Sequence, residues 1–113
     1  MSCLFCKIIA GEIPSAKVYE DEHVYAFRDI NPQAPVHVLI VPKKHMANIL
    51  ELAGDETGIA SAVVEAVKVI AEQEGIAQSG FRVTTNCGRD GAQSVEHLHF
   101  HLMGGAALSE KMA

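Results

Sequence analysis

Three histidines alternate with apolar residues in the segment 97–103, which reads His-Leu-His-Phe-His-Leu-Met. Side chains of a β-strand point alternately to opposite faces, so His97, His99 and His101 are expected on one face and the apolar residues on the other. An imidazole with an ordinary pKa of about 6.5 acts as a nucleophile, as a base or, once protonated, as an acid. This row of imidazoles therefore indicates a reactive site or a metal site.

A single metal ion bound by all three histidines is not favoured by the spacing. His97 and His101 are four residues apart, which on a strand separates their Cα atoms by roughly 13 Å. Zn–N bonds are only about 2.0–2.1 Å long, so two neighbouring histidines could share an ion while all three would be stretched. Phosphorus chemistry fits better, because one imidazole attacks and another handles the proton. A zinc metallohydrolase that uses the triad as ligands stays as an alternative.

The loop before the histidines has the composition of a phosphate-binding loop. Residues 87–94 read Cys-Gly-Arg-Asp-Gly-Ala-Gln-Ser, so small and turn-forming residues allow backbone N–H groups to approach an anion closely. Gln93 and Ser94 are expected to add side-chain donors. Most glycine-rich loops are only turns, but this loop adjoins three aligned histidines. The combination favours a bound phosphate.

Hydrophobic patterning predicts the elements that must position these residues. A long helix is predicted over 56–74, with Asp55 as its cap and Gly75 at its end. Its apolar stripe follows the helical period and consists of Ile59, Ala62, Val63, Ala66, Val67 and Ile70. A helical turn is predicted at 4–10, and strands are predicted at 18–19, 24–27, 37–41, 81–86 and 95–103. This order indicates an α+β fold with a mostly antiparallel sheet, in a single domain spanning 1–113.

Length, charge and cysteine content exclude several classes of function. The chain has 113 residues, of which 49% are apolar and 20% charged, as in ordinary folded domains. Its net charge is −5 and it has no run of five basic residues, so no nucleic-acid or membrane-surface partner is expected. Apolar stretches such as 38–41 are too short to cross a bilayer, and no signal peptide is visible. Three cysteines without such a signal predict reduced thiols and a cytoplasmic protein.

These residues resemble the histidine-triad (HIT) superfamily. Residues 97–103 fit its His-φ-His-φ-His-φ-φ pattern at every position, where φ is an apolar residue. Two further signatures are similar and occur in the right order, Asp-Ile-Asn-Pro-Gln-Ala-Pro-Val-His at 29–37 and Val-Pro-Lys-Lys-His at 41–45. Asn86, Gly88, Gln93-Ser94 and Gly104-Gly105 also match. The resemblance covers nearly the whole chain, from Phe5 to Gly105.

The chain looks most like the Hint-like branch of nucleoside phosphoramidases. The longer dinucleoside polyphosphate hydrolases match less well, and His101 argues against the uridylyltransferase branch, which has glutamine there. The resemblance implies a five-stranded antiparallel sheet with one long and one short helix, and a homodimer with a continuous ten-stranded sheet. It also implies hydrolysis of the P–N bond of purine nucleoside 5′-phosphoramidates such as AMP amides. A non-catalytic nucleotide-binding or scaffold module is the other alternative.

The motif match also implies roles for individual residues. His99 is expected to form a nucleotidyl-histidine intermediate, while His101 and the loop hold the phosphate oxygens. Ser94 is expected to contact the leaving amine, and His37 to join the histidine network behind His99. The implied nucleotide-binding set is Asp29 for the ribose, Ile30 for the nucleoside, Asn86, Gly91, Ala92, Gln93, Ser94, His99 and His101. Ala92 departs from the glycine of many relatives, and the tail after Gly105 lacks the Trp-Pro ending of animal members.

A separate metal site is expected at the start of the chain. Cys3 and Cys6 are spaced as a metal clip, and Zn²⁺ takes four nitrogen or sulfur ligands. Some prokaryotic relatives with this start bind zinc together with the His after Pro-Lys-Lys and the first triad His, which here are His45 and His97. The resemblance implies a structural Zn²⁺ and no metal requirement in catalysis. Two reduced cysteines packed as small apolar residues are the alternative.

Overall fold

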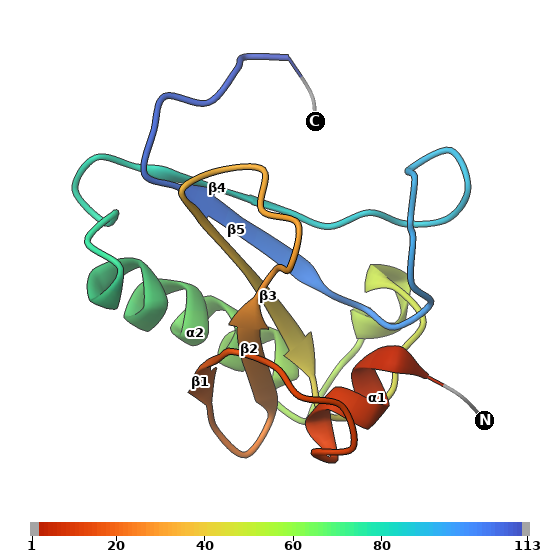
Figure 1. Ribbon diagram of the computed structural model, residues 1–113. Helices are drawn as coiled ribbons and strands as arrows, with labels where there is room; N and C mark the ends of the chain where they lie inside the picture. Colours follow the sequence, from red (N-terminus) through yellow and green to blue (C-terminus); the bar gives the residue numbers. More distant parts are fainter. Residues whose placement is uncertain (1–2, 112–113) are drawn as a thin grey trace.

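The fold is a single antiparallel sheet with a helix on each face, and the computed structural model describes residues 3–111 (Figure 1). The strands are β1 (Lys17–Glu20), β2 (Val24–Arg28), β3 (Val36–Pro42), β4 (Phe81–Thr84) and β5 (Phe100–Gly104). They are ordered β1-β2-β3-β5-β4, so β1 and β4 are the edges. The helical segments are α1 (Leu4–Ile9), the 3-10 turn η1 (Ile49–Leu52) and α2 (Ile59–Gln73). The α+β fold with one long and one short helix is confirmed, while η1 was not expected.

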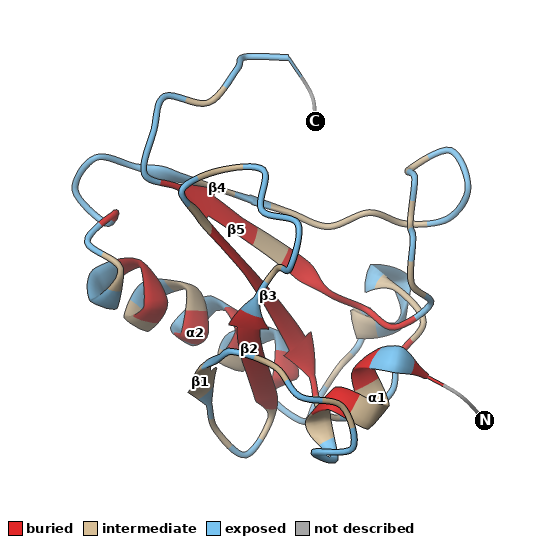
Figure 2. Cartoon of the chain, in the orientation of Figure 1, coloured by how far each residue is buried: buried red, intermediate tan, exposed pale blue. Residues whose placement is uncertain are grey.

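Alternating residues of the strands divide the core into two parts. One part packs against α2 and includes Val24, Ala26, Val38, Ile40, Leu98, Phe100 and Leu102. The other part lies on the opposite face with α1 and includes Phe5, Ile8, Tyr25, Phe27, Leu39 and Val41. Both faces of β2 and β3 are therefore buried, as the red colour of these strands shows (Figure 2). Within residues 3–111, no helix combines the length and the hydropathy required to traverse a bilayer.

The long helix begins three residues later than predicted and ends one residue earlier. Asp55 nevertheless caps it, because its carboxylate accepts hydrogen bonds from the backbone N–H groups of Ile59 and Ala60 at 3.0 and 3.3 Å. Gly58 occupies the N-cap position and has no side chain to do so. Gly75 follows the helix with a φ of 73°, a conformation in which glycine has no Cβ penalty. Both predicted boundary residues therefore act as boundaries.

The predicted strand 95–103 is shorter in the structure, where β5 begins only at Phe100. The register that pairs Ile40 with Phe100 would place Pro42 opposite Leu98, and proline has no N–H to donate. The Leu98 N–H instead donates to the carbonyl of Met46 at 2.6 Å. The predicted strand 81–86 ends at Thr84. Beyond it, the side-chain hydroxyl of Thr85, and not a backbone N–H, donates to the His99 carbonyl at 2.7 Å. Residues 95–99 therefore leave the regular ladder but stay against the sheet.

Candidate functional site

The three triad histidines lie on the face of the sheet that carries α1. His101 is paired with Leu39, which packs on the α1 side. The rings of His99 and His101 are 5.2 Å apart between centroids. The ring of Phe5 contacts both His97 and His99, at centroid distances of 5.8 and 5.0 Å. The expected alternation therefore holds, although His97 and His99 precede the regular strand.

His99 is held in one tautomer by the backbone of the triad itself. Its Nδ1 lies 2.8 Å from the carbonyl oxygen of His97, and a carbonyl oxygen only accepts. Nδ1 of the neutral ring therefore carries the proton, and Nε2 keeps a free lone pair. The His99 side chain is buried at 4% exposure, so few orientations are open to it. A neutral imidazole fixed through one nitrogen is what nucleophilic attack by the other requires.

His37 and His101 form a hydrogen-bonded pair beside His99. The backbone N–H of Gln33 donates to Nδ1 of His37 at 3.0 Å, so the proton of neutral His37 is on Nε2. This Nε2 lies 2.9 Å from Nδ1 of His101, which then accepts and carries its own proton on Nε2. A carboxylate oxygen of Asp29 lies 3.4 Å from Nε2 of His37. One backbone amide thus determines the tautomers of both rings, a role of Gln33 that no sequence pattern indicated.

Both rings of this pair favour the neutral form. Burial lowers the pKa of His37, and the charge of Asp29 offsets this only in part. Burial also lowers the pKa of His101, and the neighbouring His99 and His37 lower it further. His101 is therefore neutral at neutral pH. It presents an uncharged N–H donor rather than a fixed cation.

A pocket of about 630 Å³ adjoins this histidine pair, within the usual size range of small-molecule sites. Its lining consists of Gln33, His37, Thr84, Asn86, Asp90, Gly91, Ala92, Ser94, His101 and Met103. Six of the expected site residues are thus brought together here, and the other four, Gln33, Thr84, Asp90 and Met103, are not among the expected site residues. Asp29 lies next to His37, and Ile30 is 91% exposed beyond it. His99 and Gln93 do not line this pocket, but the ring of His99 lies 5.2 Å between centroids from that of His101, which does.

The expectation that Gln93 adds a free donor to the pocket is corrected by the structure. Both protons of its amide nitrogen are used, because it lies 2.6 Å from the carbonyl of Ala47 and 2.9 Å from that of Val95. Its amide oxygen accepts from the N–H of Gly88 at 2.9 Å. The Gln93 side chain therefore stabilises the loop through these three hydrogen bonds to backbone groups. The donors left for an anion are backbone N–H groups, Ser94 and His101.

Two neighbouring loop residues are constrained by the backbone. A Cβ at Gly91 would lie 2.5 Å from the carbonyl oxygen of Cys87, so only glycine fits there. Ala92 has a φ of 59°, the one positive value among non-glycine residues that the structure describes. This conformation is unfavourable for an L-amino acid with a Cβ. The departure from glycine at position 92 therefore strains the loop.

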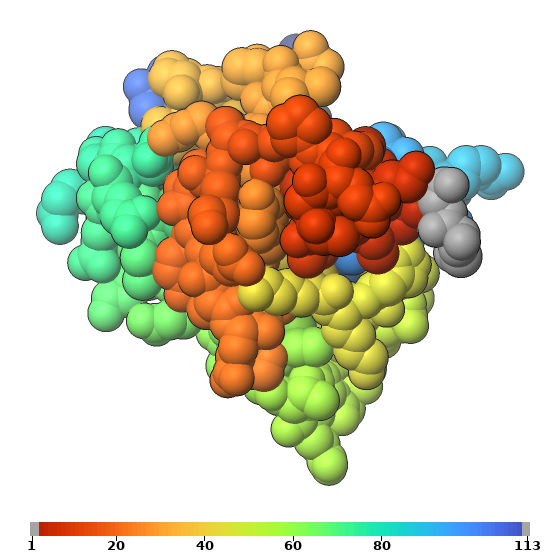
Figure 3. All heavy atoms as spheres, turned by 60° about the horizontal axis from the view of Figure 1, so that its bottom comes forward, coloured from red at the N-terminus to blue at the C-terminus, as the bar shows by residue number. Residues whose placement is uncertain are grey.

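Four metal-binding side chains meet at the end of β3 remote from the pocket. The ligand atoms of Cys3, Cys6, His45 and His97 all lie within 4.8 Å of one another. The Sγ–Nδ1 distances are 3.3 Å for Cys3–His97, 3.4 Å for Cys6–His45 and 3.6 Å for Cys6–His97. Tetrahedral Zn²⁺ with ordinary bond lengths places sulfur and nitrogen ligands roughly 3.5 Å apart. In the space-filling view the red atoms of α1 pack against the yellow segment after β3 that carries His45 (Figure 3).

The surroundings of His97 suit a metal ligand. Its Nε2 lies 2.8 Å from the carbonyl oxygen of Pro42, so this nitrogen carries the proton and Nδ1 is left free toward the cysteines. Burial lowers the pKa of His97 and keeps it neutral, as a ligand must be. Burial and the adjacent Cys3 raise the pKa of the Cys6 thiol, so a cation is needed to stabilise two thiolates here. The donor set and its spacing fit zinc.

A second cluster, Asp29, His37 and His101, also has its ligand atoms within 4.8 Å of one another. It suits a metal less well, because the Gln33 N–H occupies Nδ1 of His37 and forces the proton onto Nε2. An ion would have to displace this proton and break the bond to His101. The cluster is therefore better described as a hydrogen-bonded network.

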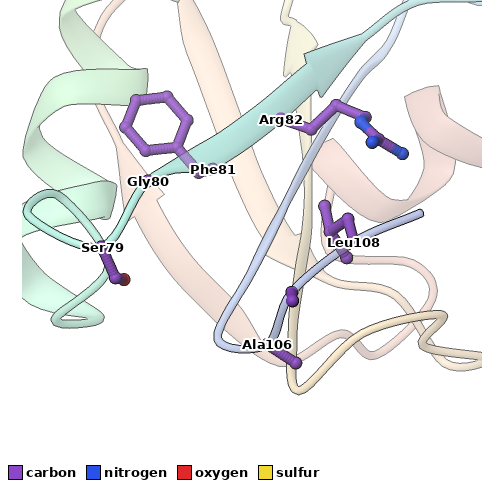
Figure 4. A pocket seen from close by; sticks show the side chains of 7 residues that line it. Ser79, Gly80, Phe81, Arg82, Ala106 and Leu108 are labelled. Atoms are coloured by element: carbon purple, nitrogen blue, oxygen red, sulfur yellow. The ribbon is translucent and has the colours of Figure 1, made fainter. Parts of the chain in front are cut away.

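A smaller cavity of about 240 Å³ lies between β4 and the segment after β5, away from the histidines. Arg82 extends over this segment, and Phe81 points to the opposite side of β4 (Figure 4). The guanidinium of Arg82 donates to the carbonyl of Ser109, so its charge is used to hold the chain. The lining contains no histidine, cysteine or carboxylate, and its one hydroxyl is that of Ser79. The site for chemistry is the histidine pocket.

Comparison with known proteins is consistent with this geometry. The family model described as HIT domain matches residues 10–108. The chain is 44% identical to the purine nucleoside phosphoramidase of Escherichia coli, over 97% of this chain and 92% of that protein. It is 47% identical to the 14 kDa zinc-binding protein of Zea mays, over 94% and 84%. The structure of a HIT family hydrolase from Clostridium thermocellum superimposes with a TM-score of 0.94 at 49% identity, covering 99% and 97% of the two chains.

Proposed function

The chain belongs to the HIT domain family, and from this premise we propose that it hydrolyses the P–N bond of purine nucleoside 5′-phosphoramidates such as AMP amides. The observation that carries the proposal is the fixed tautomer of His99. Its Nδ1–H is bonded to the His97 carbonyl, which leaves Nε2 as the nucleophile. The name of the Escherichia coli relative supports the choice of substrate.

The proposed reaction proceeds in two displacements at phosphorus. Nε2 of His99 forms a bond to phosphorus as the P–N bond breaks, and the amine takes a proton from solvent as it leaves. Ser94 lies on the pocket wall and is proposed to hydrogen-bond to this amine. Water then attacks phosphorus and gives a proton to solvent, the bond to His99 breaks, and the nucleoside monophosphate is released. His99 thus leaves the cycle as it entered.

The phosphate oxygens gain negative charge in both displacements and need donors that are already in place. Neutral His101 supplies its Nε2–H, because Nδ1 is occupied by His37. Backbone N–H groups of the loop at Gly91 and Ala92 are proposed as further donors. The network through His37 holds His101 so that little reorganisation is needed during the reaction.

The nucleoside is proposed to lie over the segment 29–30. One carboxylate oxygen of Asp29 accepts from the backbone N–H of Asn31, which fixes the side chain and leaves lone pairs for ribose hydroxyls. Ile30 is a large apolar side chain that is almost fully exposed, as expected for a residue that a ligand covers. Asn86 is proposed to act indirectly, because its amide donates to the carbonyl of Gly91 and shapes the loop.

We propose that Cys3, Cys6, His45 and His97 bind a structural Zn²⁺. The ion would stabilise the fold, because four side chains complete its tetrahedron and leave no open position for substrate. Cys3 and Cys6 would attach α1 to His97 and to the segment after β3. This assignment leaves His99 and His101 free for phosphate. No metal ion is required for the proposed reaction.

We also propose that the chain forms a homodimer through β4 and α2. The β4 edge offers unpaired backbone groups, and its Phe81 and Val83 are both 40% exposed. An apolar groove of about 410 Å³ beside it is lined by residues of α2 and by Phe81. Pairing of β4 with the β4 of a second copy would bury these groups and give a ten-stranded sheet.

Turnover of a fluorogenic adenosine phosphoramidate tests the proposed function. Wild type should release the amine, and His99→Ala should lose nearly all turnover. Chelation of metal during the assay should leave the rate of the folded protein intact. A metal requirement in turnover would favour the zinc metallohydrolase. Cleavage of only dinucleoside polyphosphates would favour the other hydrolase branch, and AMP binding without any turnover would favour a non-catalytic module.

A further inference from the structure

Phe5 lies in α1 between the N-cap residue Cys3 and Cys6, and it packs against the triad. It is 4% exposed, and its ring contacts three others edge to face. The centroid distances are 5.0 Å to His99, 5.8 Å to His97 and 5.7 Å to Phe27, with interplanar angles of 80°, 71° and 68°. Two of these three rings, His97 and His99, belong to the triad. A residue that only filled the core would not have to contact them.

The hydrogen bond to the His97 carbonyl sets the tautomer of His99, and packing contacts add resistance to rotation of the ring. The terminal torsion of histidine is broad, and a half turn about it would exchange Nδ1 with a carbon atom. That rotation would break the bond from Nδ1 to the His97 carbonyl and remove Nε2 from its place. The ring centroid of His101 lies 5.2 Å from that of His99, and the centroid of Phe5 lies 5.0 Å from it. Close packing against these two rings restricts rotation of the His99 ring.

We infer that Phe5 is a positioning residue for His99, and that it keeps the imidazole in the orientation in which Nε2 attacks phosphorus. The inference rests on the proposed function. Phe5 is itself held by its ring contacts with Phe27 and His97, at centroid distances of 5.7 and 5.8 Å. Sγ of Cys3, the N-cap of α1, lies 3.3 Å from Nδ1 of His97. His97 therefore contacts the start of α1 with its ring and orients His99 with its backbone carbonyl.

The test compares Phe5→Leu with Ile8→Val. Both positions are buried in α1 and belong to the same core cluster, but Ile8 is not part of the ring contacts around His99. Both variants keep an apolar side chain and should lose a small, similar amount of thermal stability. Each protein, with its metal bound, is measured for kcat, for AMP affinity, and for the tautomer of His99 by heteronuclear NMR of the histidine rings.

Phe5→Leu should lower kcat by about tenfold or more, since small displacements of a reacting group are costly. AMP affinity should stay within about twofold, and the NMR signature of the Nδ1–H tautomer of His99 should weaken, while Ile8→Val keeps both kcat and the signature. An unchanged tautomer and a kcat equal to that of Ile8→Val would overturn the inference. So would a rise in KM alone, which would make Phe5 a contact of the nucleoside. If wild type does not hydrolyse the phosphoramidate, the proposed function fails, and the NMR comparison still decides the role of Phe5.

Discussion

Nε2 of His37 lies 2.9 Å from Nδ1 of His101, although 64 residues separate them in the sequence. The contact arises because β3 and β5 are neighbours in the sheet and pair Leu39 with His101. His37 is two residues from Leu39 and therefore shares its face. The Gln33 N–H at the other nitrogen of His37 then makes His101 a neutral donor. The catalytic proposal depends on this neutral state.

The neutral pair predicts a loss of stability in acid. The pKa values of His37 and His101 are both lowered by burial, so the folded protein binds these protons less readily than the unfolded chain. The two neutral histidines contribute fully to the free energy of unfolding above a pH of about 6.5, the ordinary pKa of histidine. This contribution is lost as the pH falls from that value toward the lowered pKa values of the folded protein. Tm measured against pH should therefore decline more steeply for wild type than for His37→Gln. Curves of equal slope for the two proteins would contradict the prediction. The cluster of Cys3, Cys6, His45 and His97 is the same in both proteins, so its own pH dependence does not distinguish them.

The proposed nucleophile and donor should respond differently to truncation. His99→Ala should abolish turnover and leave AMP binding largely intact, because the loop and Asp29 still hold the ligand. His101→Ala should lower kcat by about 10²–10³-fold, as for loss of one oxyanion donor. Rapid acid quench of wild type should trap nucleotide on the chain, and peptide mapping should locate it at His99. Activity of more than a few per cent in His99→Ala would exclude a covalent intermediate there.

The proposed zinc site predicts a stability effect larger than its kinetic effect. Replacing Cys3 and Cys6 together by alanine should lower Tm strongly, because two ligands and the attachment of α1 are lost. Turnover of the folded fraction should fall less, since Phe27 still packs behind Phe5. Elemental analysis should find one zinc per chain in wild type and none in the double variant. Cys87→Ala is the control, because Cys87 is a free cysteine outside the cluster. Wild-type protein with little metal would favour packed thiols.

A charged side chain at Phe81, in the proposed β4 interface, tests the proposed dimer. Light scattering should give about twice the chain mass of 12.1 kDa for wild type and a monomer for Phe81→Asp. Leu50→Asp is the matched control, because Leu50 is 72% exposed but lies in η1, away from β4. It should stay dimeric. A wild-type monomer, or equal disruption by both variants, would contradict the proposed interface.

The positive φ of Ala92 predicts that glycine is tolerated there. Ala92→Gly relieves a left-handed conformation that costs roughly 1–2 kcal/mol for a residue with a Cβ, against an entropic cost of roughly 0.5–1 kcal/mol for glycine. Urea unfolding should therefore show equal or slightly greater stability than wild type. Ala60→Gly, in the exposed part of α2, should lose about 1 kcal/mol. The same loss at both positions would show that Ala92 is not strained.

Local patterns in the amino-acid sequence were enough to predict the main elements and the face on which the chemistry lies. The helical stripe from Ile59 to Ile70 and the alternation through the triad are local periodicities, and burial of apolar side chains enforces them wherever the element packs. This is why His97, His99 and His101 share one face, as predicted. It is also why the helix has Asp55 and Gly75 at its boundaries.

Which of these residues meet depends on the packed fold, because contacts between distant segments follow from strand order and register. In the fold, β5 begins only at Phe100, because Pro42 on the neighbouring strand has no N–H to pair with the residues before it. The amide nitrogen of Gln93 donates to two backbone carbonyls and is not available to a ligand. The fold also brings Cys3 to His97 across 94 residues. The ring of Phe5 reaches His99 by the same packing of α1 on the sheet. Such contacts leave no periodic pattern in the sequence, since each is made by one pair of residues whose spacing along the chain is set by loop lengths.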